Sequence, residues 1–261
     1  MEMLTDWRTL LDLLFRWIHV VAGVMWIGHL WFFNFVNAQV AKTYDAASKK
    51  AVVPQLMPRA LYWFRWGAAY TWITGILLMG LVIYMGGALD SNIGNTPGML
   101  VGLGALVVAF LVYDVLWKSP LAKNERAAAA VSYVLAVAAL FGFSRVFGGR
   151  ATWIHLGAMF GTIMAANVWM RIWPSQKKII AAAAGGPAVD PSVPALAGLR
   201  SKHNTYMSVP LMLTMVSNHF PTWYGERETG WIALAVFVAV GWGVTKLLYN
   251  KSGTAAPASY T

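Results

Sequence analysis

The 261-residue sequence contains no cysteine and few charged residues, and both absences narrow what the protein can be. Without cysteine the chain cannot form disulfides, ligate an iron–sulfur cluster through thiolates, use a thiolate nucleophile or attach a c-type haem, which needs a C-x-x-C-H segment. Redox chemistry would therefore depend on histidine, methionine, aromatic side chains or borrowed groups. Charged residues make up 11% of the chain, against about 25% in soluble globular domains. The composition excludes a soluble globular domain.

Hydrophobic residues make up 58% of the chain, and the mean hydropathy is +0.55. The sequence contains seven runs that approach the roughly 17–25 residues needed to cross a bilayer. They predict an all-α, polytopic membrane bundle of about seven transmembrane helices that forms a single integral membrane domain over residues 1–261. The first run is not expected to be a cleavable signal, because acidic residues precede it and no small-residue cleavage site follows it. The expected spans are Leu11–Val36, Trp63–Met85, Met99–Leu116, Ala127–Val146, Trp153–Trp173, Thr205–Trp223 and Gly230–Leu248.

Basic residues are distributed unevenly between the connections of these spans. Lys and Arg number 15 on one side and 4 on the other. The positive-inside rule therefore predicts that the N-terminus is outside and the C-terminus cytoplasmic. The net charge of +10 is then mainly a topology signal, and nucleic acid is not expected as a partner. Residues 174–202 are expected to be a cytoplasmic connection rich in Ala, Pro and Gly with room for one short surface helix, and residues 250–261 a flexible tail.

This topology sorts the five histidines of the chain by depth. His19, His155 and His219 lie near the outer ends of the first, fifth and sixth spans, so we expect them to form an outer layer. His29 lies ten residues beyond His19 and is thus roughly 15 Å deeper. His203 lies at the cytoplasmic mouth of the sixth span.

A b-type haem in a helical bundle needs neutral imidazoles that face one another from different helices, and cationic groups near the membrane surface for its propionates. The outer layer is predicted to supply both, because Arg16, Arg145 and Arg150 are expected at the same depth as its histidines. A second haem between His29 and His203 is the further hypothesis. No residue is assigned a catalytic role. The candidate metal ligands are His19, His155, His219 and His203.

The polar groups also have structural interpretations. A histidine inside the membrane is often an interhelical hydrogen-bond partner, and one at a membrane end can face the headgroups. Asp12 with Arg16, and Asp114 with Lys118, are i,i+4 pairs whose charges are expected to neutralise one another. Four asparagines are expected to form interhelical hydrogen bonds: Asn34, Asn167, Asn204 and Asn218.

Two long segments resemble a known family. "GRATWIHLGAMFGTIMAANVWMRIWPSQKK" (Gly149–Lys178) and "SKHNTYMSVPLMLTMVSNHFP" (Ser201–Pro221) resemble the membrane domain of bacterial membrane-bound urate oxidases, the urate hydroxylase PuuD family. Shorter matching segments occur at Arg16–Gly28, Trp63–Gly75 and Tyr113–Ser119, in the order of the family. The resemblance covers most of the chain, from the first span through the sixth.

The resemblance implies a bacterial inner-membrane protein with urate as its substrate. Gly67 stands where similar sequences often have Glu, so any urate chemistry that needs this carboxylate would be lost. Family members that oxidise urate resemble a membrane domain fused to a cytochrome c, whereas this sequence has no C-x-x-C-H segment. Electrons would therefore pass to a separate cytochrome c. His29 occupies a position that varies in the family. The histidines in segments similar to the histidine-bearing motifs of the family are His19, His155, His203 and His219.

Two functions from different classes follow, and a third is disfavoured. The first is a b-type haem electron-transfer protein or oxidoreductase related to urate hydroxylase, which takes electrons from urate or a quinol. The alternative is a haem-binding structural or assembly subunit of a larger respiratory or photosynthetic complex, without a substrate of its own. A transporter is disfavoured because Pro210 is the only proline well inside an expected span, whereas transporters often use interrupted helices.

Overall fold

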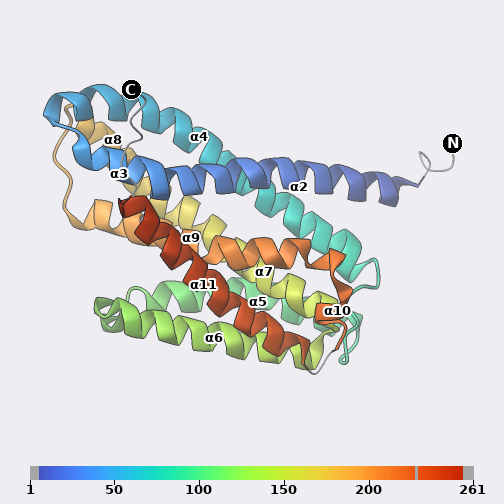
Figure 1. Cartoon of the computed structure of the whole chain (residues 1–261). Helices are drawn as coiled ribbons and strands as arrows, with labels where there is room; N and C mark the ends of the chain where they lie inside the picture. Colours follow the sequence, from blue (N-terminus) through green and yellow to red (C-terminus); the bar gives the residue numbers. More distant parts are fainter. Residues whose placement is uncertain (1–5, 227–228, 255–261) are drawn as a thin grey trace.

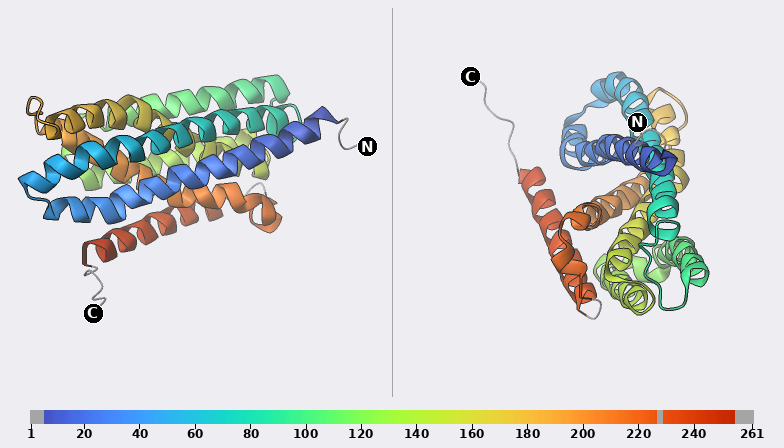
Figure 2. Two further views of the ribbon diagram at one scale, coloured as in Figure 1. Left: turned by 90° about the horizontal axis from the view of Figure 1, so that it is seen from above. Right: turned by 90° about the vertical axis from the view of Figure 1, so that its right-hand side faces the viewer.

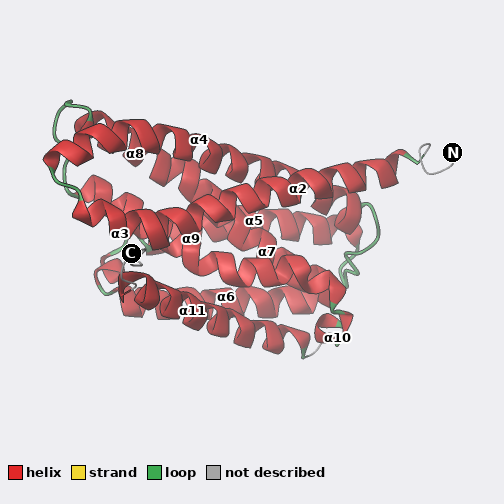
Figure 3. Ribbon diagram, turned by 45° about the horizontal axis from the view of Figure 1, so that its top comes forward, coloured by secondary structure: helices red, strands yellow, loops and turns green. Residues whose placement is uncertain are grey.

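The computed structural model describes residues 6–226 and 229–254, in which helices occur and no strand does (Figures 1 and 3). Several long helices contain a π-helical or 3-10 segment, which we label η. The elements are α2 (Trp7–Trp31), η1 (Phe32–Asn37), α3 (Ala38–Val40), η2 (Ala41–Thr43), α4 (Ala46–Leu78), η3 (Met79–Tyr84), α5 (Asn95–Leu116), η4 (Pro120–Lys123), α6 (Glu125–Val146), α7 (Gly149–Asn167), η5 (Val168–Ile172), α8 (Trp173–Ala183), α9 (Ser192–Val216), η6 (Ser217–His219), α10 (Pro221–Tyr224) and α11 (Gly230–Thr254).

The predicted all-α membrane bundle is confirmed. Within the described residues, five helical stretches are long and apolar enough to cross a membrane, and α5, α6 and α11 are three of them. The other two are the continuous stretches from α2 through η2 and from α4 through η3. The expected fifth and sixth spans lie in the α7–α8 stretch and in α9, which are not among these five. The number of membrane crossings and their sidedness stay predictions.

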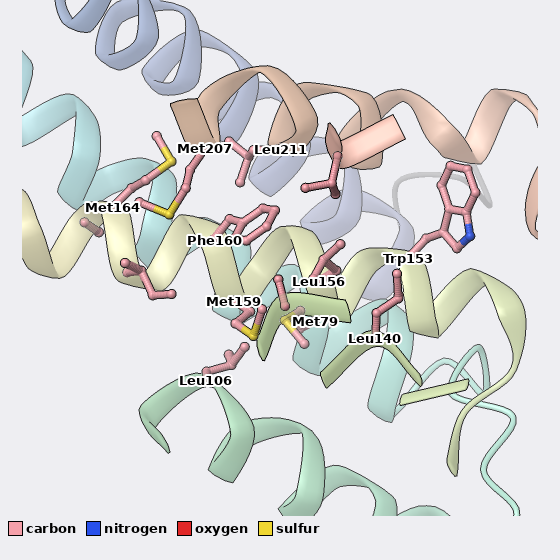
Figure 4. Packing of buried hydrophobic residues seen from close by; sticks show 14 of the residues in the cluster. Met79, Leu106, Leu140, Trp153, Leu156, Met159, Phe160, Met164, Met207 and Leu211 are labelled. Carbon is pink, nitrogen blue, oxygen red and sulfur yellow. The ribbon is translucent and has the colours of Figure 1, made fainter. Parts of the chain in front are cut away.

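The low apolarity of α7 is explained by its position in the bundle. This helix contacts α4, α5, α6, α9 and α11, so its neighbours are protein. Buried polar residues such as Thr152, His155 and Asn167 are therefore tolerated in it, because other helices supply their hydrogen-bond partners. Seen end-on, α7 lies between the α2–α4 pair and the α5–α6 pair (Figure 2). Figure 4 shows side chains of α7 packed at the centre of the core: Leu156, Met159, Phe160 and Met164, between Met207 and Leu211 of α9 and Leu106 of α5.

Close helix packing is made possible by glycines. A Cβ on Gly157 of α7 would collide with the Thr214 side chain of α9. A Cβ on Gly67 of α4 would lie 3.1 Å from the backbone nitrogen of Trp26 and 3.2 Å from the carbonyl oxygen of Ala22, both in α2. The glycine that stands in place of the family's Glu thus lies at a tight helix crossing, where the α2 backbone leaves little room for a side chain.

Two segments that the sequence predicts to be a connection and a flexible tail are largely helical where the structure describes them. The 174–202 connection is mostly helical: α8 continues directly from the π-helical η5, and Pro174 lies at their junction, where the helical hydrogen-bond register changes. Only residues 184–191 separate α8 from α9. At the other terminus, α11 continues through Thr254, so the predicted tail is helical over 250–254, and residues 255–261 lie outside the described residues.

Candidate functional site

The two ends of the bundle hold different polar groups, so we name them. The N-side end is the one where α2, α5 and α7 begin, and the far end is the one where α5 ends and α9 begins (Figure 1).

His19 of α2 is anchored to α4. Its Nδ1 lies 3.1 Å from the Thr74 hydroxyl, which itself donates to the carbonyl of Tyr70 at 2.6 Å. Because the hydroxyl has one proton and uses it on Tyr70, it accepts from His19, so Nδ1 carries the imidazole proton. The Nε2 atom then presents a lone pair, which is the form in which histidine ligates a metal.

His155 of α7 is fully buried near the N-side end. Its Nδ1–H donates to the carbonyl of Ala151 at 2.7 Å, and its Nε2 lies 3.0 Å from the Tyr84 hydroxyl. The Phe147 ring stacks on the imidazole with the ring centroids 4.3 Å apart. A Cβ on Gly102 of α5 would collide with Nε2 and with the Tyr84 hydroxyl. His155 thus already has a partner on each ring nitrogen, and α5 closes the space beside it.

Two histidines of the expected outer layer, His19 and His155, do not face one another. The partners of His19 and His155 on the α4–η3 helix, Thr74 and Tyr84, are ten residues apart, which is roughly 15 Å along the axis. His155 is two residues from the α9-facing Gly157, about 200° around the helix, so it points away from α9. In the described part of the chain, His19 and His155 therefore do not form an opposed pair.

The arginines expected near the outer histidines have partners of their own. Arg16 forms the predicted pair with Asp12 at 2.7 Å, and both side chains are exposed. The guanidinium of Arg145 lies over the Phe141 ring at 4.7 Å. Arg150 donates through Nε to Asn218 at 2.8 Å. Asn218 directly precedes the exposed His219, so Arg150 bonds to the chain neighbour of one predicted ligand, and Arg16 lies one helical turn before another, His19.

The inner histidines are also separated. His29 donates its Nδ1–H to the carbonyl of Met25 in its own helix at 2.7 Å. The side of α9 that meets α2 carries Ser201 and Ser208, which accept from Asn34 and Trp31 of the α2–η1 stretch. His203 is two residues from Ser201, about 200° around α9, and contacts α5 instead. In addition, no cluster of three or more His, Asp or Glu residues suited to a metal occurs in residues 6–226 and 229–254.

A groove with a volume of about 830 Å³ runs between α5 and α6 and is floored by α7, α9 and α11. Its walls extend from Val101 to Leu116 along α5, which is roughly 22 Å. Near the N-side end the lining is apolar. At the far end the groove is lined by Tyr113, Trp117, Glu125, Arg126, Lys202, His203 and Lys246.

His203 is the histidine that lines this groove. Its Nδ1 lies 2.8 Å from the Tyr113 hydroxyl, and its ring centroid lies 3.9 Å from that of Trp117. The Tyr113 hydroxyl also accepts from Asn167 at 3.0 Å, and Asn167 donates to Asn204 at 2.9 Å. These bonds fix the His203 ring from α5, α7 and α9, and leave Nε2 available to a ligand.

A charge network lies behind Tyr113. Asp114 accepts from Lys118 at 2.6 Å, as predicted, and also from Arg171 at 2.5 Å and Arg200 at 2.9 Å. The Arg200 side chain is fully buried, and its guanidinium lies 4.8 Å from the centroid of the Tyr113 ring. The network joins α5, η5 and α9 at the far end and holds Tyr113 against His203.

Some of these residues are absent from the sequence-based site. Tyr113, Trp117 and Tyr84 were not singled out, because nothing in one sequence separates an aromatic hydrogen-bond donor from a member of an aromatic belt. Arg200 lies in the predicted connection and was therefore not expected to be buried. Its closeness in the chain to His203 and Asn204 is the one sequence feature that points to a place in the site. The four asparagines form the predicted interhelical hydrogen bonds.

Comparison with known families decides the relationship. The family model described as urate oxidase N-terminal matches residues 43–260. The chain belongs to the urate oxidase N-terminal family. The matched region includes His155, His203 and His219, whereas His19 and His29 precede it. No curated protein and no solved structure matches the chain.

Proposed function

We propose that this member of the urate oxidase N-terminal family is an electron-transfer subunit of the bacterial inner membrane, related to urate hydroxylase. It takes electrons from urate or a quinol and delivers them to a separate cytochrome c. The observation that supports this best is the groove whose far end is formed by the His203–Tyr113 pair, in a chain of a urate oxidase family. A groove open between membrane helices suits a redox partner that arrives from the bilayer.

Haem b is the proposed cofactor, and the donor chemistry of His19 fits it, because its Nδ1 proton is held by Thr74 and Nε2 is left as the ligating atom. His19 and His155 are neutral-type imidazoles whose protons are held on Nδ1 by local acceptors, as in most metal-ligating histidines. Their contacts on the α4–η3 helix, Thr74 and Tyr84, are too far apart for one haem to use both histidines. His19 is the first candidate axial ligand, and His155 would have to exchange its Tyr84 contact for the iron. Arg150, next to Asn218 and His219, is a candidate partner for a propionate. When bound, haem supplies one-electron transfer.

The other residues act by positioning. The Asp114 network neutralises part of the charge of Arg171 and Arg200 at the far end and keeps the Tyr113 ring in place. Tyr113 in turn orients His203.

The proposal is tested by a reduced-minus-oxidised absorption spectrum of the protein purified after haem-replete expression. We expect a b-type α-band, and its absence together with a negative pyridine haemochrome assay would overturn haem binding. Among His19→Ala, His155→Ala and His219→Ala, the variant that loses the band identifies the ligand. If none loses it, this ligand assignment is wrong. Reduction of the haem by urate or by a quinol then shows the electron donor.

A structural subunit is the second candidate, and one observation favours it. Both ring nitrogens of His155 already have protein partners, as expected of a histidine that only stabilises helix packing. A protein that contains haem but is reduced neither by urate nor by a quinol would support this alternative and refute the oxidoreductase.

A further inference from the structure

We propose that the groove between α5 and α6 is a binding site for an isoprenoid quinone, with the quinone ring beside His203 and Tyr113 and the isoprenoid chain along the apolar wall. The inference rests on the proposed redox function for its biological meaning, and it names the substrate class that this site accepts. The binding itself can be measured whether or not haem is present.

The shape of the groove matches a small polar ring with a long apolar chain. The groove is roughly 22 Å long, and its polar lining gathers at the far end. From the far end toward the N-side end, the space between α5 and α6 exists because small residues line both walls: Ala105, Ala109, Ala136, Ala139 and Gly142. The chain of a quinone would bury apolar surface against this lining.

The far end has the groups that recognise a quinone ring. Tyr113 and Trp117 offer aromatic faces, and His203 offers Nε2 for a hydrogen bond to a carbonyl or hydroxyl of the ring. Trp117 is itself fixed, because its indole N–H donates to Ser132 of α6 at 3.1 Å. An amphipathic site of this kind places few polar groups at one point and leaves the rest apolar.

A phospholipid fits the same groove less well. Glu125 accepts from Lys202 at 2.6 Å, so a carboxylate stands at the far end, where a lipid phosphate would have to bind, and pairs with one of the three basic residues there. A phospholipid would also place acyl carbons beside His203 and leave a partly buried nitrogen unsatisfied, which costs free energy. A neutral ring with hydrogen-bonding oxygens avoids both penalties.

Haem is also a poorer occupant of this groove. His203 is the only histidine of the described residues that lines it, and the Trp117 ring packs closely on the imidazole. The groove is therefore not built around an opposed pair of axial ligands.

The test uses the full-length protein in lipid nanodiscs and a photoreactive azido-quinone. We expect labelling of peptides from α5, α6 or α9, and competition by quinones that carry a long or a short isoprenoid chain. Gly142→Phe narrows the N-side end of the groove, where a Cβ would meet no described atom within 4 Å. Gly104→Phe on α5 is the matched control, because a Cβ there also meets no described atom within 4 Å and the residue does not line the groove.

The variants distinguish binding of the isoprenoid chain from binding of the quinone ring. Gly142→Phe should weaken competition by a long-chain quinone about tenfold and leave that of a single-unit quinone unchanged. His203→Leu should weaken both about fivefold through the lost hydrogen bond. The proposal is overturned if Gly142→Phe behaves like Gly104→Phe, if anionic phospholipid displaces the probe as well as quinone does, or if His203→Leu removes a haem band. A protein that binds quinone without a haem band would refute the proposed cofactor and keep this site.

Discussion

Replacement of Asp114 by asparagine is the substitution for which the structure predicts the largest loss of stability. The carboxylate lies in α5 and is the acceptor shared by Lys118, Arg171 and Arg200. Asparagine keeps the size and one carbonyl oxygen but removes the negative charge. Arg200, whose side chain is fully buried, would then be left without a counter-charge in a low-dielectric region.

The expected magnitude follows from burial. Removal of one partner from a buried ion pair costs about 3–5 kcal/mol, because the remaining charge stays buried and unpaired. We expect about 3 kcal/mol for Asp114→Asn, since Lys118 is 56% exposed and Arg171 is 23% exposed, and both can be hydrated. The exposed pair of Asp12 and Arg16 is the matched control, and its loss in Asp12→Asn should cost less than about 1 kcal/mol.

The assay is reversible unfolding in mixed micelles of a mild detergent and dodecyl sulfate, followed by circular dichroism. A second variant tests the cause: Arg200→Met in the Asp114→Asn background removes the unpaired charge and should restore part of the free energy of unfolding. If Asp114→Asn loses no more stability than Asp12→Asn, or if the added Arg200→Met destabilises further, the reasoning about the buried charge is wrong.

Two glycine substitutions test the helix packing by the same unfolding assay. Gly67→Ala should destabilise the protein by about 1 kcal/mol, because the steric cost of its Cβ against the α2 backbone exceeds the roughly 1 kcal/mol that alanine gains over glycine in a helix. Gly28→Ala in α2 is the control: its Cβ meets no described atom within 4 Å, so this variant should be neutral or stabilising. Equal effects would refute the tight crossing. Gly102→Ala should destabilise by at least about 2 kcal/mol, because its Cβ would displace His155 from Tyr84, and Gly104→Ala is its control. An unchanged Gly102→Ala midpoint would show that α5 does not close on this histidine.

The helices themselves were largely predictable from the sequence. The expected spans over 99–116 and 127–146 end at the residues where α5 and α6 end, because long apolar runs stopped by polar residues define membrane helices. The sequence predicts one short helix in the 174–202 connection, because proline usually signals a break, whereas α8 continues from η5 through Pro174 and α9 already begins at Ser192. The helix α4 begins 17 residues before its expected span, because its first turns are polar and a search for apolar runs does not include them.

The residues of the site were predictable in type but not in grouping. The sequence singled out His203 and Asn167, and it identified the pair of Asp114 with Lys118. It placed His155 in a layer with two other histidines because depth along a helix can be counted from a sequence. It could not place the side chains around the helix axis relative to neighbours, because the rotation of each helix is set by packing against the others.

The sequence by itself determined that this protein is a helical membrane bundle with buried polar groups, because composition and run length depend only on the chain. Membership in the urate oxidase N-terminal family is likewise written in the sequence. The tertiary structure decided which polar groups meet. It turned His155 toward Tyr84 and away from α9, joined Arg200 to Asp114, and placed His203 at the polar end of a groove between α5 and α6. The physical reason is that burial of polar groups in an apolar medium is favourable only when partners converge from several helices, and that convergence is a property of the packed bundle.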